Sequence, residues 1–297
     1  MDIVGRIKDE LQAGSSTPSS IRSSFGGVAR NVAENLSRLG QNVILLTAVG
    51  EDYNGDRLLQ KAKEAGINTD YSIRTKDHPT GTYIALLDKN SQLVYAIDDM
   101  RSASAISKSH ILQHASLFKE ASLVFFDANL PQDTLNVIVT LAKRAKLKIC
   151  SDPTSSTLAP RIKQFLPNLF LVTANNAEAA VFCDSSKPLV NRKQALAAAK
   201  NLVIKGVEIA IVTMAELGLC YATSETNGHI PAIKTDILDP TGAGDALIAA
   251  VLFSLLNDIP LDDAVRLGVS AASLTLRYQG AVVPDLTLEK LYDHLVI

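Results

Sequence analysis

The chain has 297 residues, of which 47% are hydrophobic and 20% are charged, so it can bury a sizeable core as one or two α/β domains. Its 29 basic residues nearly balance 31 acidic ones, giving a formal net charge of −2 without a run of like charges. This balance argues against a nucleic-acid or membrane-surface partner and favours a small-molecule ligand.

The cysteines and the N-terminal segment indicate a compartment. Cys150, Cys183 and Cys220 are widely spaced and lie mostly in apolar surroundings, which favours reduced core thiols over a disulfide framework. The sequence has no apolar stretch as long as a membrane span, and MDIVGRIKDELQ lacks the apolar core of a signal peptide. We therefore expect a cytoplasmic protein.

Short β-branched runs alternate with helical patterns along most of the chain. Such alternation is typical of βαβ units and predicts a doubly wound, mostly parallel sheet flanked by helices. No domain boundary is evident, so we expect one domain over residues 1–297. The expected strands are 42–50, 121–129, 147–152, 169–175 and 208–214, and the main expected helices cover 28–40, 54–66, 130–146, 191–206, 243–256 and 261–278.

Residues 80–99, TGTYIALLDKNSQLVYAIDD, interrupt this rhythm. Two strand-like arms flank the turn DKNSQ, which predicts a β-hairpin. The hairpin could be a lid that excludes water from a site, or an edge hairpin that extends the sheet, and the pattern fits both equally. The serine-rich segment 10–24 is expected to be a loop or a strand of the same lid, which would then comprise about 4–24 and 79–100.

The stretch DPTGAGDAL, residues 239–247, places small residues and two acids directly before a helical pattern. Gly242, Ala243 and Gly244 allow backbone N–H groups to be exposed at a helix start, where an anion can bind. Asp245 lies in the first turn and could accept a proton from a substrate hydroxyl while those N–H groups stabilise a transferring phosphoryl group. Glycine and aspartate also serve as ordinary turn and capping residues, so the motif alone leaves both interpretations open.

A second glycine-rich stretch, FGGVARNVAENLSRLG, occupies residues 25–40. Gly26 and Gly27 would allow close backbone approach to a ligand, and the amide of Asn31 can both donate to and accept from hydroxyl groups. This combination suits recognition of a polyol. A tight loop followed by an ordinary asparagine explains the same residues.

Four motifs in order and spacing resemble the ribokinase-like, or PfkB, family of carbohydrate and nucleoside kinases. They are the glycine pair with Asn31, N-x-x-E at Asn175 to Glu178, VTMAELG at 212–218, and DPTGAGD at 239–245. The resemblance covers nearly the whole chain. It implies a ribokinase-like α/β fold with a small β lid, and transfer of the ATP γ-phosphoryl group to a primary hydroxyl.

The resemblance also implies roles on the nucleotide side of the site. Asp245 would be the catalytic base and Gly242, Ala243 and Gly244 the anion hole. Glu178 would help to hold Mg²⁺ through water. The ATP-binding residues would be Asn175, Glu178, Thr213, Gly218, Thr241, Gly242 and Gly244. Asp239, Thr241 and Gly280 match a loop that in some members holds a monovalent cation such as K⁺.

On the substrate side, the stretches GGVARNVAENLSRLG and YAIDDM are most similar to the pseudouridine kinases of the family. This implies phosphorylation of the 5′-hydroxyl of pseudouridine, with another sugar or nucleoside of the PfkB type as the alternative. Tyr83 and Asp99 are candidate base or ribose contacts, although a packed tyrosine or an exposed lid charge would give the same pattern. The implied substrate-binding residues are Asp2, Gly26, Gly27, Asn31, Tyr83, Asp99, Asn129 and Asp245.

The chain departs from the family pattern at its start. The usual first strand and its glycine-rich exit would precede Asp2, so the chain looks N-terminally clipped. A missing internal strand would leave neighbouring backbone groups unpaired and apolar surface uncovered. A ligand-binding member that no longer catalyses is therefore a further alternative, and a homodimer formed through the lid is a further expectation.

Overall fold

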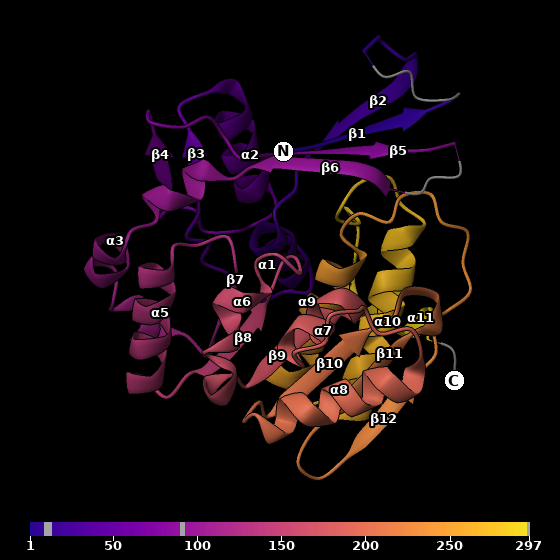
Figure 1. Ribbon diagram of the computed structural model, residues 1–297. Helices are drawn as coiled ribbons and strands as arrows, with labels where there is room; N and C mark the ends of the chain where they lie inside the picture. Colours follow the sequence, from indigo (N-terminus) through magenta and orange to yellow (C-terminus); the bar gives the residue numbers. More distant parts are fainter. Residues whose placement is uncertain (9–13, 90–92, 296–297) are drawn as a thin grey trace.

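The computed structural model describes residues 1–8, 14–89 and 93–295. Its main sheet has six strands in the order β12–β11–β10–β9–β8–β7 (Figure 1). The strands β7 to β10 run parallel, and β11 and β12 add an antiparallel edge. The sheet is thus mostly parallel, as the alternating pattern predicts. The strands are β7 (Leu123–Asp127), β8 (Lys148–Asp152), β9 (Leu171–Asn175), β10 (Ile209–Thr213), β11 (Leu219–Ala222) and β12 (Asn227–Ile230).

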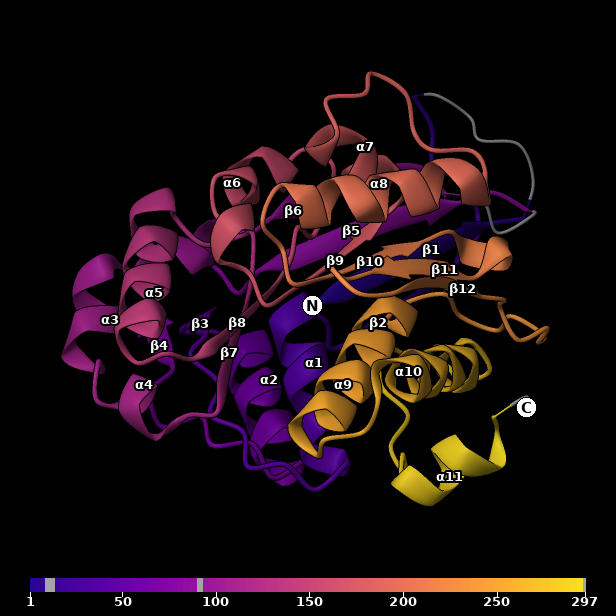
Figure 2. The same cartoon turned by 90° about the horizontal axis from the view of Figure 1, so that it is seen from below.

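Helices cover both faces of this sheet, as the view from below shows (Figure 2). One face packs against α5 (Gln132–Arg144), α6 (Ala159–Lys163), α7 (Asn176–Phe182) and α8 (Arg192–Ile204). The other packs against α1 (Val28–Arg38), α9 (Ala243–Leu256), α10 (Leu261–Leu276) and α11 (Leu288–Asp293). Because successive strand side chains point to opposite faces, Ile211 joins the core beneath α9 while its neighbour Val212 joins the core beneath α8.

The long helices agree with the sequence pattern to within a few residues. The side chain of Asp52 caps α2 (Tyr53–Glu64) by accepting from Gly55 N at 2.8 Å, and Asn191 caps α8 in the same way. The shorter elements are α3 (Lys108–Gln113), α4 (Leu117–Glu120) and three 3₁₀ turns, η1 (Arg101–Ala105), η2 (Leu166–Asn168) and η3 (Ala215–Leu217). In the described parts of the chain, no helix is both long and apolar enough to cross a membrane.

A separate four-stranded sheet, here called the lid sheet, lies beside the main body (Figure 1). Its order is β2 (Ser19–Ser24), β1 (Asp2–Ile7), β5 (Thr82–Leu87) and β6 (Leu93–Asp99). The antiparallel pairing of β5 with β6 confirms the predicted hairpin, and β1 runs parallel to β5. Parts of the expected lid, 9–13 and 90–92, lie outside the described residues.

The prediction of a strand at 42–50 is wrong for most of that range. Only β3 (Ala48–Gly50) is a strand, and it pairs with β4 (Ile73–Thr75) in a two-stranded sheet apart from the main one. The preceding residues make a single bridge, from Ile44 to Asn68. The reason is that a strand needs a paired neighbour, and within the described residues the main sheet ends at β7.

Candidate active site

Polar side chains gather where the parallel strands end. Asp127 ends β7, Asp152 ends β8, Asn175 ends β9 and Thr213 ends β10. The carboxyl ends of parallel strands meet at one edge of a sheet, which is where open α/β sheets bind their ligands. The N-terminal turn of α9 carries Asp245 to the same region. The two carboxyl groups are near enough for the charge of Asp152 to raise the pKa of Asp245.

The start of α9 is built by two glycines with different surroundings. Gly242 caps the helix in the left-handed conformation with φ of 79°, and a Cβ there would lie 2.0 Å from the carbonyl oxygen of Ala281. At Gly244 a Cβ would meet no atom within 4 Å, so the space in front of the first turn is open. Gly242 is therefore required by packing, whereas Gly244 leaves room for a ligand beside Ala243 and Asp245.

Asp245 is held by the helix on the other side of the site. The Nδ2 group of Asn31 donates a 2.6 Å hydrogen bond to Oδ2 of Asp245. Arg30 donates to Oδ1 of the same amide, which turns Nδ2 toward the carboxylate. Arg30 is itself fixed by the carbonyl oxygen of Gly26 at 3.0 Å and by Glu34 at 2.5 Å. The acid is thus oriented by a hydrogen-bonded chain of buried side chains.

The environment of Asp245 favours its protonated form. Asp245 as a whole residue is half-buried, but protein atoms surround its carboxyl group. This burial raises the pKa of the carboxyl well above its usual range. The hydrogen bond from Asn31 and the charge of Arg30 lower the pKa, while the charges of Asp152 and Asp2 raise it further. A carboxyl with a raised pKa is the kind of group that acts as a general base near neutral pH.

Asp2 and Gly26 are in direct contact. A Cβ on Gly26 would lie 2.0 Å from Oδ2 of Asp2, so the carboxylate packs against the glycine backbone. Asp2 is only 7% exposed, and burial raises its pKa. It pairs in register with Tyr83 of β5, whose pKa is raised by burial and by the nearby Asp2 charge. The lid sheet and the glycine-rich loop therefore meet at Asp2.

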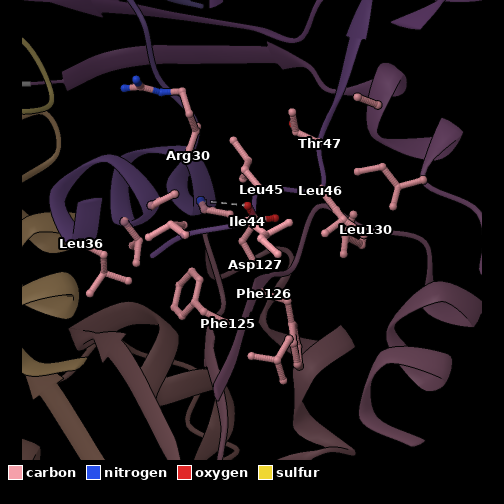
Figure 3. Close-up of a pocket in the computed structure, with 18 of the residues that line it drawn as sticks. Arg30, Leu36, Ile44, Leu45, Leu46, Thr47, Phe125, Phe126, Asp127 and Leu130 are labelled. Atoms are coloured by element: carbon pink, nitrogen blue, oxygen red, sulfur yellow. Dashed lines mark hydrogen bonds between the residues drawn. The ribbon is translucent and has the colours of Figure 1, made fainter. Parts of the chain in front are cut away.

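Asp127 ties the loop that carries Asn129 to α1. Its Oδ1 accepts from the backbone N–H and from Nδ2 of Asn129 at 2.9 and 3.1 Å. Its Oδ2 accepts from Ala29 N at 3.3 Å, the dashed line in Figure 3. Asp127 therefore makes capping hydrogen bonds at the end of β7.

One cavity of about 880 Å³ collects several of the expected substrate residues. Asp2, Gly26, Gly27 and Asn129 line it. The other expected substrate-binding residues, Asn31, Tyr83, Asp99 and Asp245, are not among its lining residues. Asp99 is bound by Arg101 through two hydrogen bonds of 2.9 and 2.7 Å, which lower its pKa to about 2.

Asn175 and Glu178 form a reciprocal cap at the start of α7. Oδ1 of Asn175 accepts from Glu178 N at 3.0 Å, and Oε2 of Glu178 accepts from Asn175 N at 2.8 Å. Glu178 is 4% exposed, and burial together with the charge of Asp152 raises its pKa to about 7. The N-x-x-E spacing therefore has a structural role in addition to any role toward a ligand.

Asp152 is the residue that the sequence reasoning missed. Its Oδ1 accepts from Thr154 N at 2.7 Å and its Oδ2 from Thr173 Oγ1 at 3.0 Å. Burial raises its pKa to about 6, and the charge of Asp127 adds to the effect. The signal was present, because an acid at the end of a predicted parallel strand lies at the ligand-binding edge.

The remaining expected residues fall into two small groups. Asp239 accepts from Thr241 N at 2.9 Å and from Gly280 N at 3.3 Å, so these three residues form one loop junction. Thr213 pairs with Asn175 across β10 and β9. Gly218 has φ of 83°, and a Cβ there would lie 2.0 Å from Ile230 O. The described residues contain no cluster of three or more His, Cys, Asp or Glu side chains that could hold a metal ion directly.

Comparison with known proteins decides the family. The pattern of the "pfkB family carbohydrate kinase" matches residues 2–288. The chain belongs to this family. Its activity class is therefore that of the family, the sugar and nucleoside kinases.

Individual relatives are more distant. A pseudouridine kinase from Escherichia coli is 28% identical over 289 residues, covering 97% of this chain and 91% of that protein. A guanosine-inosine kinase from Exiguobacterium acetylicum is also 28% identical, covering 96% of this chain and 95% of that protein. The structure of Arabidopsis thaliana ribokinase complexed with ribose and ATP superposes with a TM-score of 0.84 at 19% identity, covering 100% of this chain and 96% of that one. This confirms the ribokinase-like fold.

Proposed function

We propose that the protein transfers the γ-phosphoryl group of ATP to the 5′-hydroxyl of a nucleoside, with pseudouridine as the preferred acceptor. The observation that carries the proposal is the position of Asp245. Its carboxylate is held by Asn31 at 2.6 Å and lies in the first turn of a helix whose Gly244 faces open space.

The chemistry requires one base and one anion site. The 5′-oxygen attacks the γ-phosphorus while its proton passes to the carboxylate of Asp245, and the bond from the γ-phosphorus to the bridging oxygen breaks to release ADP. The backbone N–H groups at Gly242, Ala243 and Gly244, with the positive end of the helix dipole, stabilise the charge on the phosphoryl oxygens. The raised pKa of Asp245 makes its carboxylate a stronger base than an exposed aspartate.

The acidic edge of the sheet fits Mg²⁺ bound together with ATP. Burial raises the pKa of Asp152 and of Glu178, and a nearby carboxylate adds to each effect, so a cation bound there would favour their ionised forms. Mg²⁺ prefers oxygen ligands and usually keeps several waters, so these carboxylates would orient its hydration shell. Asn175, Thr213, Gly218 and Thr241 would line the nucleotide site. The junction of Asp239, Thr241 and Gly280 is where we place the monovalent cation, K⁺.

The ribose would lie in the cavity beside the glycine-rich loop. Asp2 and Asn129 line that cavity and offer acceptors and donors to ribose hydroxyls, while Gly26 and Gly27 allow close approach. The base would face the lid sheet, where Tyr83 and Asp99 lie. The identity to a pseudouridine kinase supports pseudouridine, and the equal identity to a guanosine-inosine kinase makes purine nucleosides the necessary comparison.

The lid sheet would cover the acceptor. It would also join two copies of the chain, each of which forms a single domain. Register places Ile21, Tyr95 and Ile97 on one face of this sheet. Their exposed fractions are 72%, 59% and 65%, which is high for large apolar side chains gathered on one face. A second copy of the same sheet would bury them in a self-complementary interface.

A phosphoryl-transfer screen tests the proposed substrate. The acceptors are pseudouridine, uridine, guanosine, inosine and ribose, each with ATP and Mg²⁺, and kcat/KM is measured for each. We expect the highest value for pseudouridine. A higher value for guanosine or ribose would refute the substrate and leave the kinase activity standing, whereas binding of pseudouridine without ATP turnover would identify a non-catalytic member.

A further inference from the structure

Helix α1 carries a row of three charged side chains beside the residue that holds Asp245. Arg30, Glu34 and Arg38 follow one another at intervals of four residues, so they lie on one face of the helix. The two oxygens of Glu34 bind different partners. Oε2 accepts from Nη1 of Arg30 at 2.5 Å, and Oε1 accepts from Nη2 of Arg38 at 2.6 Å. Glu34 is therefore shared between two arginines.

The two ion pairs of Glu34 differ in burial. The side chain of Arg30 is 6% exposed, whereas that of Arg38 is 23% exposed and also donates to the carbonyl oxygen of Pro284. A buried guanidinium is costly unless a carboxylate compensates it. Among the described residues, Glu34 is the one carboxylate that is hydrogen-bonded to Arg30. Arg30 therefore depends on Glu34 for compensation of its charge.

Each nitrogen of the Arg30 guanidinium has an acceptor. Nε donates to Gly26 O at 3.0 Å, and Nη1 donates to Glu34. Nη2 donates to Phe25 O at 3.0 Å and to Oδ1 of Asn31. The guanidinium is planar and its donors keep a fixed geometry, so holding Nη1 also holds the direction of Nη2. Glu34 thus controls the donor that reaches Asn31.

The side-chain amide of Asn31 has two orientations that differ by a half-turn. In the observed one, Oδ1 faces Arg30 and Nδ2 donates to Asp245. In the other, Nδ2 would face the guanidinium, donor against donor, and Oδ1 would face the carboxylate, acceptor against acceptor. A fixed Arg30 therefore selects the orientation in which Asn31 holds Asp245.

We propose that Glu34 is a positioning residue, which acts through Arg30 and Asn31 to direct the carboxylate of Asp245 toward the acceptor hydroxyl. This role rests on the proposed function, in which Asp245 is the base. Both oxygens of Glu34 are taken by arginines, so Glu34 acts through them and not on a substrate. Its loss should therefore appear in kcat.

Glu34→Gln tests this role, and Arg38→Met is its matched control. Glutamine keeps the length of the side chain, removes the charge and puts an amide donor where an acceptor oxygen stood. Arg38→Met removes the other ion pair of Glu34 and leaves the bond to Arg30 in place. We expect kcat per folded molecule to fall about tenfold in Glu34→Gln and to stay within about twofold of wild type in Arg38→Met.

A second variant guards against poor folding of Glu34→Gln. Arg30→Met combined with Glu34→Gln removes both charges, so no buried guanidinium is left without its carboxylate. The orientation of Asn31 is lost all the same. This double variant should show the same loss in kcat, about tenfold, per folded molecule.

A double-mutant cycle with Asn31→Ala separates positioning from a general loss of stability. If Glu34 acts through Asn31, Glu34→Gln should lower kcat by less than about twofold once residue 31 is alanine. A residue that only stabilises α1 would lower kcat by the same factor in both backgrounds.

The acid limb of the kcat/KM profile gives an independent readout. Loss of the hydrogen bond from Asn31 raises the pKa of Asp245, whereas removal of a nearby negative charge would by itself lower that pKa. The other charges that face this carboxyl, Arg30, Asp152 and Asp2, are unchanged in Glu34→Gln. We therefore expect the limb of this variant to move to higher pH.

Asp245→Asn is measured in the same series, with the acceptor that the substrate screen shows to be fastest. The positioning role is overturned, and the proposed function stands, if Asp245→Asn is nearly inactive and Glu34→Gln gives any of four results. These are an unchanged kcat, an equal loss in the Asn31→Ala background, a loss no larger than that of Arg38→Met, or an acid limb that fails to move to higher pH. Wild-type turnover in Asp245→Asn would overturn both.

Discussion

Asn31 and Asp245 are 214 positions apart in the chain, yet their side chains share a 2.6 Å hydrogen bond that joins α1 to α9 across the proposed phosphoryl-transfer site. The bond has one direction, because the amide donates and the carboxylate accepts. It stabilises the ionised form of Asp245 against the burial that disfavours it.

Removing this donor should therefore change the pH dependence of catalysis. In Asn31→Ala the pKa of Asp245 rises further, because a hydrogen bond that favours the carboxylate is lost. Activity that needs the ionised base disappears as pH falls through this pKa, so the acid limb of the kcat/KM profile should move to higher pH. If Asn31 contacted substrate alone, KM would rise and the limb would stay where it is.

The two glycines at the start of α9 should respond differently to alanine. Gly242→Ala places a methyl group 2.0 Å from Ala281 O in a left-handed conformation, and we expect a loss on the order of 1–3 kcal/mol in the free energy of unfolding. Gly244→Ala should keep or slightly raise stability, since its methyl group meets no atom within 4 Å. The same methyl group enters the anion site, so KM for ATP should rise and kcat should fall. Urea unfolding and steady-state kinetics measure the two effects.

The titration of Glu178 should lower the free energy of unfolding as pH rises. Its pKa is about 7 in the folded protein against an ordinary value of 4.5, so between these values the folded state retains a proton that the unfolded state releases. Stability due to this group is highest below pH 4.5 and falls until about pH 7. Glu178→Gln removes the titration and can still accept from Asn175 N. We expect the variant to exceed the wild type by on the order of 2 kcal/mol above pH 7 and to show no such gain at pH 4.

The apolar face of the lid sheet should control assembly. Ile97→Lys introduces a charge among Ile21 and Tyr95, which would be buried in the proposed dimer, so sedimentation should show a shift to monomer. Ile204→Lys alters an apolar residue of greater exposure far along the chain on α8 and should leave the association unchanged. A wild-type protein that is monomeric at all concentrations would contradict the proposed interface.

Much of the fold follows from local patterns in the sequence. The helices at 28–38, 132–144, 192–204 and 243–256 show amphipathic or apolar runs, and the helix at 192–204 also has the capping residue Asn191 before it. The hairpin of β5 and β6 shows two apolar arms around a polar turn. The error at 42–50 has a physical cause. An apolar run specifies a strand only when a neighbour pairs with it, and pairing is a property of the whole fold.

The site was predictable where a motif sets local geometry and was not where contacts join distant segments. The helix-start glycines and the Asn175–Glu178 cap follow from spacing alone. The hydrogen bond from Asn31 to Asp245 and the effect of the Asp152 charge on Asp245 depend on contacts between elements far apart in sequence. The sequence shows that Asp152 ends a strand, but it does not show which distant side chains lie beside it.

The most direct test of the central claim is the turnover of Asp245→Asn under saturating ATP, Mg²⁺ and pseudouridine. The amide keeps the size of the side chain but cannot accept the hydroxyl proton as a carboxylate does. We expect kcat to fall by about 10²–10⁴-fold while ATP affinity and thermal stability stay near their wild-type values. Wild-type turnover in this variant would contradict the assignment of Asp245 as the base.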